Sequence, residues 1–90
     1  MSDDGTERLW LVDRNYDDKG LIVLAYATLD GSAVRRIERA PIAVERMGGV
    51  TAAVDADPGT LESVEDDDRR ERYASEAARM ADRHDPDENV

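Results

Sequence analysis

The sequence has no cysteine and no phenylalanine, and it has one tryptophan, one histidine and one lysine. Without cysteine, neither a disulfide bond nor a thiolate metal site supports the fold. Because aromatic side chains are few and the apolar content is 40%, the core has little volume. A small domain buries roughly 60% of the surface that its unfolded chain exposes. We therefore expect a single, marginally stable domain.

Long apolar runs and recognisable catalytic motifs are also missing. No stretch approaches the roughly 18 apolar residues of a membrane-spanning helix, and the first residues do not resemble a basic, apolar leader. His84 has no evident catalytic partner, and there is no glycine-rich phosphate loop or nucleophile motif. We interpret the aspartate clusters as solvated surface. The sequence thus predicts a cytoplasmic protein that is not an enzyme, with no cofactor, no metal site, no membrane contact and no small-molecule substrate.

The charge balance is strongly acidic: 22 acidic residues against 12 basic ones give a net charge of −10. Aspartate supplies 14 of the acidic residues, and Lys19 stands beside 11 arginines. This preference for aspartate and arginine extends over the whole chain, so it indicates an environment rather than a partner. In molar salt the Debye length is about 3 Å, which screens the repulsion between carboxylates. We interpret the composition as that of a protein from a high-salt cytoplasm.

Three stretches in the first half of the chain have the pattern of strands. They are residues 8–15, 20–29 and 32–39. Turn-forming residues separate them. Residues 16–20 end with a glycine where a bulged hairpin loop needs a left-handed residue, and Asp30-Gly31 is typical of a two-residue type I′ turn.

A two-residue turn at Asp30-Gly31 would fix the pairing of the strands on either side of it. The expected register places Tyr26 opposite Arg35 and Leu24 opposite Ile37. Both faces of the third stretch mix apolar and charged residues, which is typical of an edge strand. The second stretch would then lie in the middle of the sheet.

The second half of the chain is predicted to contain one more strand and a helix. Residues 41–50 indicate an irregular connection or a single helical turn, and residues 50–56 alternate like a fourth strand. From Asp66 onward the apolar residues fall on one helical stripe, with carboxylates at the start and Pro86 after the end. We expect a helix over 66–84.

Together these elements predict an α+β fold. It has an antiparallel sheet of three to four strands, with hairpins at 16–20 and 30–31 and the C-terminal helix packed on one face. The domain spans residues 8–84, and the acidic ends at 1–7 and 85–90 are expected to be flexible.

The second strand is apolar on both faces, although the helix can cover only one of them. The other face must be covered by residues 41–50, by a second copy of the chain or by another protein. We expect a homodimer or a complex with another protein, because an isologous interface needs one self-complementary patch. The candidate interaction residues on or beside this strand are Trp10, Val23 and Tyr26.

Arg35, Arg36 and Arg39 form the one basic cluster of the sequence. They are typical of a charged edge strand, and alternatively they could bind phosphates. The leading functional hypothesis is a non-enzymatic protein-interaction or regulatory module, with a homodimer as its expected state. The alternative is a nucleic-acid-associated regulator that uses these three arginines.

Two segments carry a resemblance to known proteins: WLVDRNYDDKGLIVLAYATLDG and RRERYASEAARMADRHDPDE. In overall pattern the chain resembles small acidic proteins of haloarchaea that belong to uncharacterised families. The resemblance implies a halophilic, cytoplasmic origin, and it transfers no functional residue.

Overall fold

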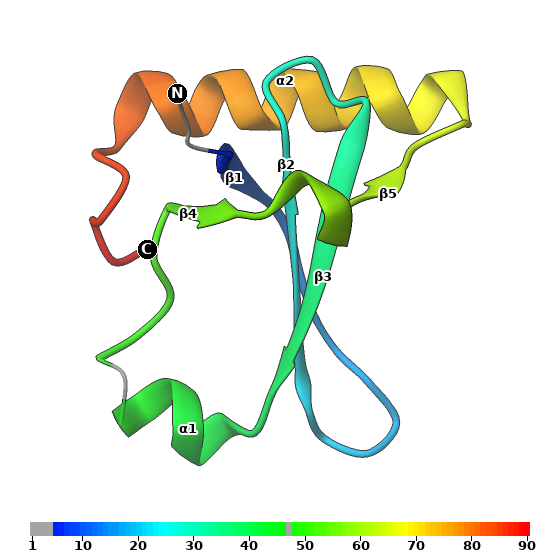
Figure 1. The fold of residues 1–90 in the computed structure, drawn as a ribbon. Coiled ribbons are helices and arrows are strands. Elements are labelled where there is room, and N and C mark those ends of the chain that lie inside the picture. Colours follow the sequence, from blue (N-terminus) through cyan, green and yellow to red (C-terminus); the bar gives the residue numbers. More distant parts are fainter. Residues whose placement is uncertain (1–4, 47) are drawn as a thin grey trace.

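The computed structural model describes residues 5–46 and 48–90. Over these residues the chain forms an antiparallel five-stranded sheet in the order β4-β1-β2-β3-β5, with a long C-terminal helix (Figure 1). The elements are β1 Glu7–Tyr16, β2 Ile22–Ala27, β3 Ala33–Arg39, α1 Pro41–Arg46, β4 Ala53–Ala56, the 3-10 turn η1 Pro58–Thr60, β5 Glu62–Ser63 and α2 Asp67–Arg83. None of the described helices has the length and apolar character to cross a membrane.

The predicted α+β class, the antiparallel sheet and the C-terminal helix are confirmed. The sheet has one strand more than the expected maximum, because β5 pairs with the first two residues of β3. A two-residue strand has no detectable sequence pattern of its own. Of the two alternatives left open for residues 41–50, the helical one is found, as the short helix α1, and Asp66 caps α2 by accepting a hydrogen bond from Arg69 N at 3.1 Å.

The β2–β3 register is as predicted, but the expected type I′ turn is wrong. Tyr26 lies opposite Arg35 and Leu24 opposite Ile37. A type I′ turn needs positive φ at both Asp30 and Gly31. Among the described residues no side-chain-bearing residue has positive φ, whereas Gly31 has φ 72°.

The loop between β2 and β3 therefore contains four residues, Leu29 to Ser32. Thr28 N donates to Ala33 O at 3.0 Å and closes it. Loops over 30–31 and over 29–32 have the same centre, so both give the same pairing of β2 with β3. This explains why the register was predictable although the turn type was not.

The hairpin at residues 16–20 has the expected left-handed glycine. Gly20 has φ 82° and donates its N–H to Asp17 O at 3.1 Å. The Asp17 carboxylate also accepts from the backbone N–H groups of Lys19 and Leu21, both at 2.9 Å. These bonds close the turn between β1 and β2. Because β2 pairs with β1 on one side and with β3 on the other, it lies in the middle of the sheet.

One face of the sheet packs against α2. The buried side chains on this side form two adjoining clusters: Ala25, Ala27, Val34, Val64 and Tyr73, and Trp10, Ala52, Ala53 and Ala77. Most of these residues are small, so the helix lies close to the strands. The helix also lies close to the β2–β3 loop, where a Cβ added to Gly31 would overlap backbone atoms of α2.

The opposite face of β2 is covered by the chain itself. The buried cluster there contains Leu9, Leu11, Ile22, Leu24, Tyr26, Val50 and Ala56. Val44 of α1, Val54 of β4 and Leu61 pack against it. Of the three expected covers, residues 41–50 supply part of this one through Val44 and Val50, and Val54 and Leu61 add to it. The two apolar faces of β2 therefore do not by themselves require a second copy.

Residues 85–90 were expected to form a flexible tail, but they lie along the segment that precedes β4 (Figure 1). Ala52 N donates to Glu88 O at 2.8 Å, and Ala53 N donates to Pro86 O at 3.0 Å. Val90 N donates to Val50 O at 2.8 Å. The charge of this segment suggested that it is solvated. Its backbone groups instead form hydrogen bonds with the backbone groups on the outer edge of residues 50–53. At the other end, residues 1–4 lie outside the described residues and Glu7 begins β1.

Candidate functional site

Two candidate interaction residues, Trp10 and Tyr26, lie in the core. Trp10 packs with Ala77 on the α2 side, and Tyr26 lies on the opposite face. The Tyr26 hydroxyl donates to Thr51 O at 2.8 Å. Burial raises the pKa of Tyr26, and this effect outweighs the hydrogen bond and the charges of Arg14 and Arg39, which lower it. Both side chains are therefore largely buried, Trp10 at 7% and Tyr26 at 2% exposure.

Val23 lies on the α2 side of β2, beside Asn15 of β1 and Glu38 of β3. Its side chain is half-buried, because the helix packs over the other end of the strands. The surroundings are polar, so Val23 is not part of an extended apolar patch.

The three arginines of β3 do not form one basic patch. Successive residues of a strand point to opposite faces, so Arg36 lies on the α2 side and Arg35 and Arg39 on the other. Arg36 Nη1 lies 3.3 Å from the Glu62 carboxylate of β5, in an exposed ion pair. Such pairs contribute little to stability. The arrangement supports the interpretation of β3 as a charged edge strand.

Most of the outer edge of β3 is free. β5 pairs with Ala33 and Val34, and among the described residues no strand lies on the outer side of residues 35–39, whose inner side pairs with β2. Since Val64 N donates to Ser32 O at 2.9 Å, the backbone groups of Ser32 face outward. In an antiparallel ladder the outward residues alternate, so those of Arg36 and Glu38 face outward as well. The Glu38 carbonyl accepts a bond at 2.9 Å from the neighbouring Arg39 side chain. This edge therefore offers two N–H donors and two C=O acceptors to an added strand.

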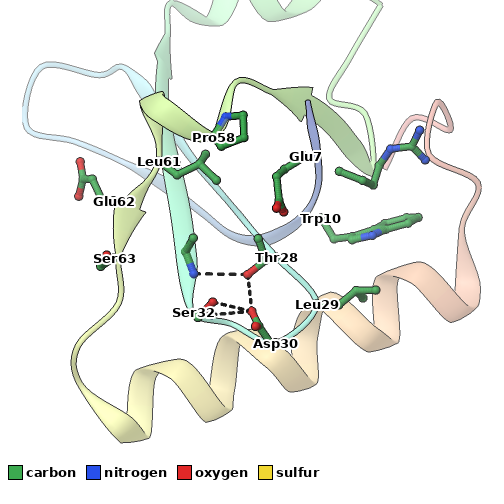
Figure 2. Close-up of a pocket in the computed structure, with 12 residues that line it drawn as sticks. Glu7, Trp10, Thr28, Leu29, Asp30, Ser32, Pro58, Leu61, Glu62 and Ser63 are labelled. Atoms are coloured by element: carbon green, nitrogen blue, oxygen red, sulfur yellow. Dashed lines mark hydrogen bonds between the residues drawn. The ribbon is translucent and has the colours of Figure 1, made fainter. Parts of the chain in front are cut away.

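An open hollow of about 650 Å³ lies where the β2–β3 loop meets η1 and β5 (Figure 2). Its wall contains apolar groups of Trp10, Leu29, Pro58 and Leu61. Its charged groups are Glu7, Asp30, Glu62 and Arg8, and Arg8 Nε is paired with Asp55 Oδ1 at 2.6 Å. The hollow is therefore acidic.

The polar groups of this hollow hold the loop in shape. One oxygen of Asp30 accepts hydrogen bonds from Thr28 Oγ1 at 2.6 Å, Ser32 Oγ at 2.7 Å and Ser32 N at 3.0 Å (Figure 2). The Thr28 hydroxyl, followed by the two Ser32 donors, lowers the pKa of Asp30 to about 2. A carboxylate with so low a pKa is a weak general base at neutral pH. The network therefore supports the loop rather than acid–base chemistry.

The sole histidine is also used structurally. His84 Nδ1 lies 2.9 Å from Glu88 Oε2, and this contact lowers the pKa of Glu88. It links the end of α2 to the segment that lies along residues 50–53. Within residues 5–46 and 48–90, no group of three or more His, Asp or Glu side chains is placed to hold a metal ion.

The fold and its free edge define the protein as a small α+β domain with an incompletely paired antiparallel sheet. The chain belongs to DUF7967, a family of unknown function whose model matches residues 2–90. No curated protein and no solved structure matches the chain.

Sequence reasoning missed two features of this surface. It did not single out Glu38, whose outward backbone groups become visible only once the register and the reach of β5 are known. It also missed the hollow, because Leu29, Pro58 and Leu61 are far apart in the sequence and meet through the pairing of β5 with β3. The signal for Glu38 was present in the charged pattern of an edge strand.

Proposed function

We propose that the protein is a non-enzymatic interaction module that binds its partner by strand addition at the outer edge of β3. The observation that carries this proposal is the outer side of residues 35–39, beside which the described part of the chain places no strand once β5 has ended. Extended segments add to such edges through main-chain hydrogen bonds, and side chains supply the selectivity.

The charges on this stretch suit selective binding. Arg36 and Glu38 flank Ile37 and lie on the α2 side of the sheet, where both are exposed. Charged side chains on an edge oppose pairing with unrelated strands. A partner with the opposite order of charges would turn this opposition into attraction.

We further propose that this module works in a high-salt cytoplasm. Its net charge of −10 makes any two acidic proteins of this kind repel one another in dilute solution. In molar salt the long-range repulsion is screened, so hydrogen bonds and other direct contacts between the two surfaces decide which partners bind. The family membership is consistent with the expected uncharacterised family and leaves this function as a proposal.

A proline substitution tests strand addition. In Glu38→Pro the outward N–H is removed, and the monomer should keep its fold because proline is tolerated where an edge N–H faces solvent. Asp18→Pro is the matched control: it also removes one carboxylate, and residue 18 is the second residue of the turn closed by Gly20 N and Asp17 O.

The readout is hydrogen exchange at the Arg36 and Glu38 amides in molar KCl, measured on the dilute protein and again after addition of concentrated protein or of an extract of the source cells. We expect both amides of the wild type to become protected, and the Arg36 amide to stay unprotected in Glu38→Pro. Protection in Glu38→Pro equal to that in Asp18→Pro would argue against strand addition.

A second candidate is a nucleic-acid-associated regulator. The observation in its favour is that Arg35 and Arg39 share a face with Arg14, and that Tyr16 at the end of this face is 70% exposed. Arg39→Glu should then weaken RNA or DNA binding in molar KCl, whereas Arg36→Glu on the opposite face should not. Equal binding by both variants and the wild type would remove this candidate.

A further inference from the structure

We infer that the partner strand at this edge is β3 of a second copy, paired antiparallel around a two-fold axis at Ile37. The inference rests on the proposed strand addition and names its partner and register. In this dimer two five-stranded sheets would join into one continuous sheet.

The length of the free stretch selects the register. β5 occupies the edge at Ala33 and Val34, and Pro41 begins α1 two residues after Arg39. In Figure 1, α1 lies on the opposite side of β3 from β5. The five residues from 35 to 39 remain, and Ile37 is their centre. A two-fold axis at Ile37 pairs the whole free stretch and nothing beyond it.

Neighbouring registers are less suitable. A shift that places Arg36 opposite Arg36 also places Val34 opposite Glu38, but Val34 is already paired with Glu62. A shift that places Glu38 opposite Glu38 pairs fewer residues and brings like charges together. The registers between these place an outward residue opposite an inward one, so no ladder hydrogen bonds form.

In the Ile37-centred register the outward groups match. Arg36 of one copy lies opposite Glu38 of the other, and the two-fold axis repeats this pair. Each pair exchanges two main-chain hydrogen bonds, which uses all four donors and acceptors of the edge on both copies. The Glu38 carbonyl has two lone pairs, so its bond from Arg39 can persist. On the α2 side each guanidinium faces a carboxylate of the second copy.

On the other face of the joined sheet, one contact between the two copies is favourable and one is unfavourable. Ile37 meets Ile37 on the axis and extends the apolar cluster that contains Leu24 and Tyr26. Arg35 lies opposite Arg39, which is unfavourable in dilute solution. Salt weakens the close contacts of both signs alike, but it screens most strongly the longer-range repulsion between two chains of charge −10. The dimer should therefore be tighter in molar KCl than in dilute buffer.

Charge reversal at the two outward positions tests the register. The variants are Arg36→Glu, Glu38→Arg and the double variant, and sedimentation equilibrium in molar KCl gives the dimer dissociation constant. Each single variant places like charges opposite each other twice, so we expect the dimer dissociation constant to rise roughly tenfold or more. The double variant restores both pairs and should return near the wild type.

Mixing the two single variants gives the sharpest readout. A chain with Glu at 36 and 38 is complementary at both positions to a chain with Arg at both, so the mixture should form a heterodimer tighter than either homodimer. Arg69→Glu and Glu71→Arg on exposed positions of α2 make the same charge changes away from the edge. Mixing these controls should leave self-association unchanged.

Two results would overturn the inference: a wild type that stays monomeric in molar KCl at every concentration, or single variants that dimerise like their α2 controls. Strand addition itself is tested separately by amide exchange. If the wild type is monomeric and another protein protects the Arg36 and Glu38 amides, the register proposal fails and the proposed function stands. If no partner protects these amides, both fail.

Discussion

Gly31 is the position where a single added methyl group should most disturb the fold. It sits in the β2–β3 loop with φ 72°, and it lies against the backbone of α2. A Cβ at this position would overlap Arg70 O and would lie 2.8 Å from Ala74 N. Both atoms belong to a helix backbone, which cannot rotate away as a side chain can.

The expected cost of Gly31→Ala has two parts. A left-handed conformation costs an L-residue about 1–2 kcal/mol relative to glycine. Separating the loop from the helix adds an overpacking cost of about 1–3 kcal/mol. The sum, roughly 2–5 kcal/mol, is a large share of the total for a small domain, whose stability is about 5–15 kcal/mol.

Gly20→Ala is a matched control in the other hairpin. Gly20 has a similar φ of 82°, and a Cβ there would have no neighbouring atom within 4 Å. It should therefore lose only the conformational part, about 1–2 kcal/mol. Urea titration of both variants in molar KCl, followed by far-UV circular dichroism, gives the free energy of unfolding.

The comparison isolates the helix contact. If Gly31→Ala is destabilised no more than Gly20→Ala, the close approach of the loop to α2 is refuted. A larger loss of unfolding free energy in Gly31→Ala, with an unchanged slope of that free energy against urea concentration, would support the close approach. The unchanged slope would show that the denatured states are comparable.

Three further outcomes follow from the charges and pKa values. The wild type should unfold at lower urea in dilute buffer than in molar KCl, because salt screens the net charge of −10; an unchanged midpoint would contradict this. The raised pKa of Tyr26 means that its contribution is present below pH 10 and is lost as pH rises through the folded-state pKa. In Tyr26→Phe the free energy of unfolding should therefore fall less steeply as the pH rises. This variant should be about 1 kcal/mol less stable at neutral pH, because it lacks the hydrogen bond to Thr51 O. For Asp30 the pKa of about 2 lies below the ordinary 3.8, so its contribution is present above that value and is lost as pH falls through 2. Asp30→Asn should be less sensitive to acid over this range, and a wild-type acid profile in the variant would count against the loop network.

The central hairpins could be predicted because their signals are local. Gly20 and Gly31 mark the loops, and the alternation of Ile22, Leu24 and Tyr26 identifies a face of the strand. The type I′ turn was wrong because the loop is shaped by tertiary contact with α2 and by the bonds of Asp30, which a local pattern does not contain. The register survived because both turns share one centre.

The C-terminal segment and the short strand could not be predicted, because their order depends on distant partners. Residues 85–90 are polar and charged, yet their backbone groups pair with residues 50–53. β5 has two residues, and its position follows from the turn at η1. That position also decides where the free edge of β3 begins, so the candidate site depends on the least predictable element of the sheet.

The charges of β3 show why guarding an edge and using it for binding are compatible. An arginine and a glutamate on the same side of a strand oppose most incoming strands, because one of the two meets a like charge or an apolar group. Two copies related by an axis midway between these residues place each charge opposite its complement. The axis then falls at Ile37, which is also the middle of the stretch that β5 leaves free. The charge order and the length of the free edge thus point independently to the same register. A charge reversal changes the charge order and leaves the length of the free edge as it is, so it tests the first argument separately from the second.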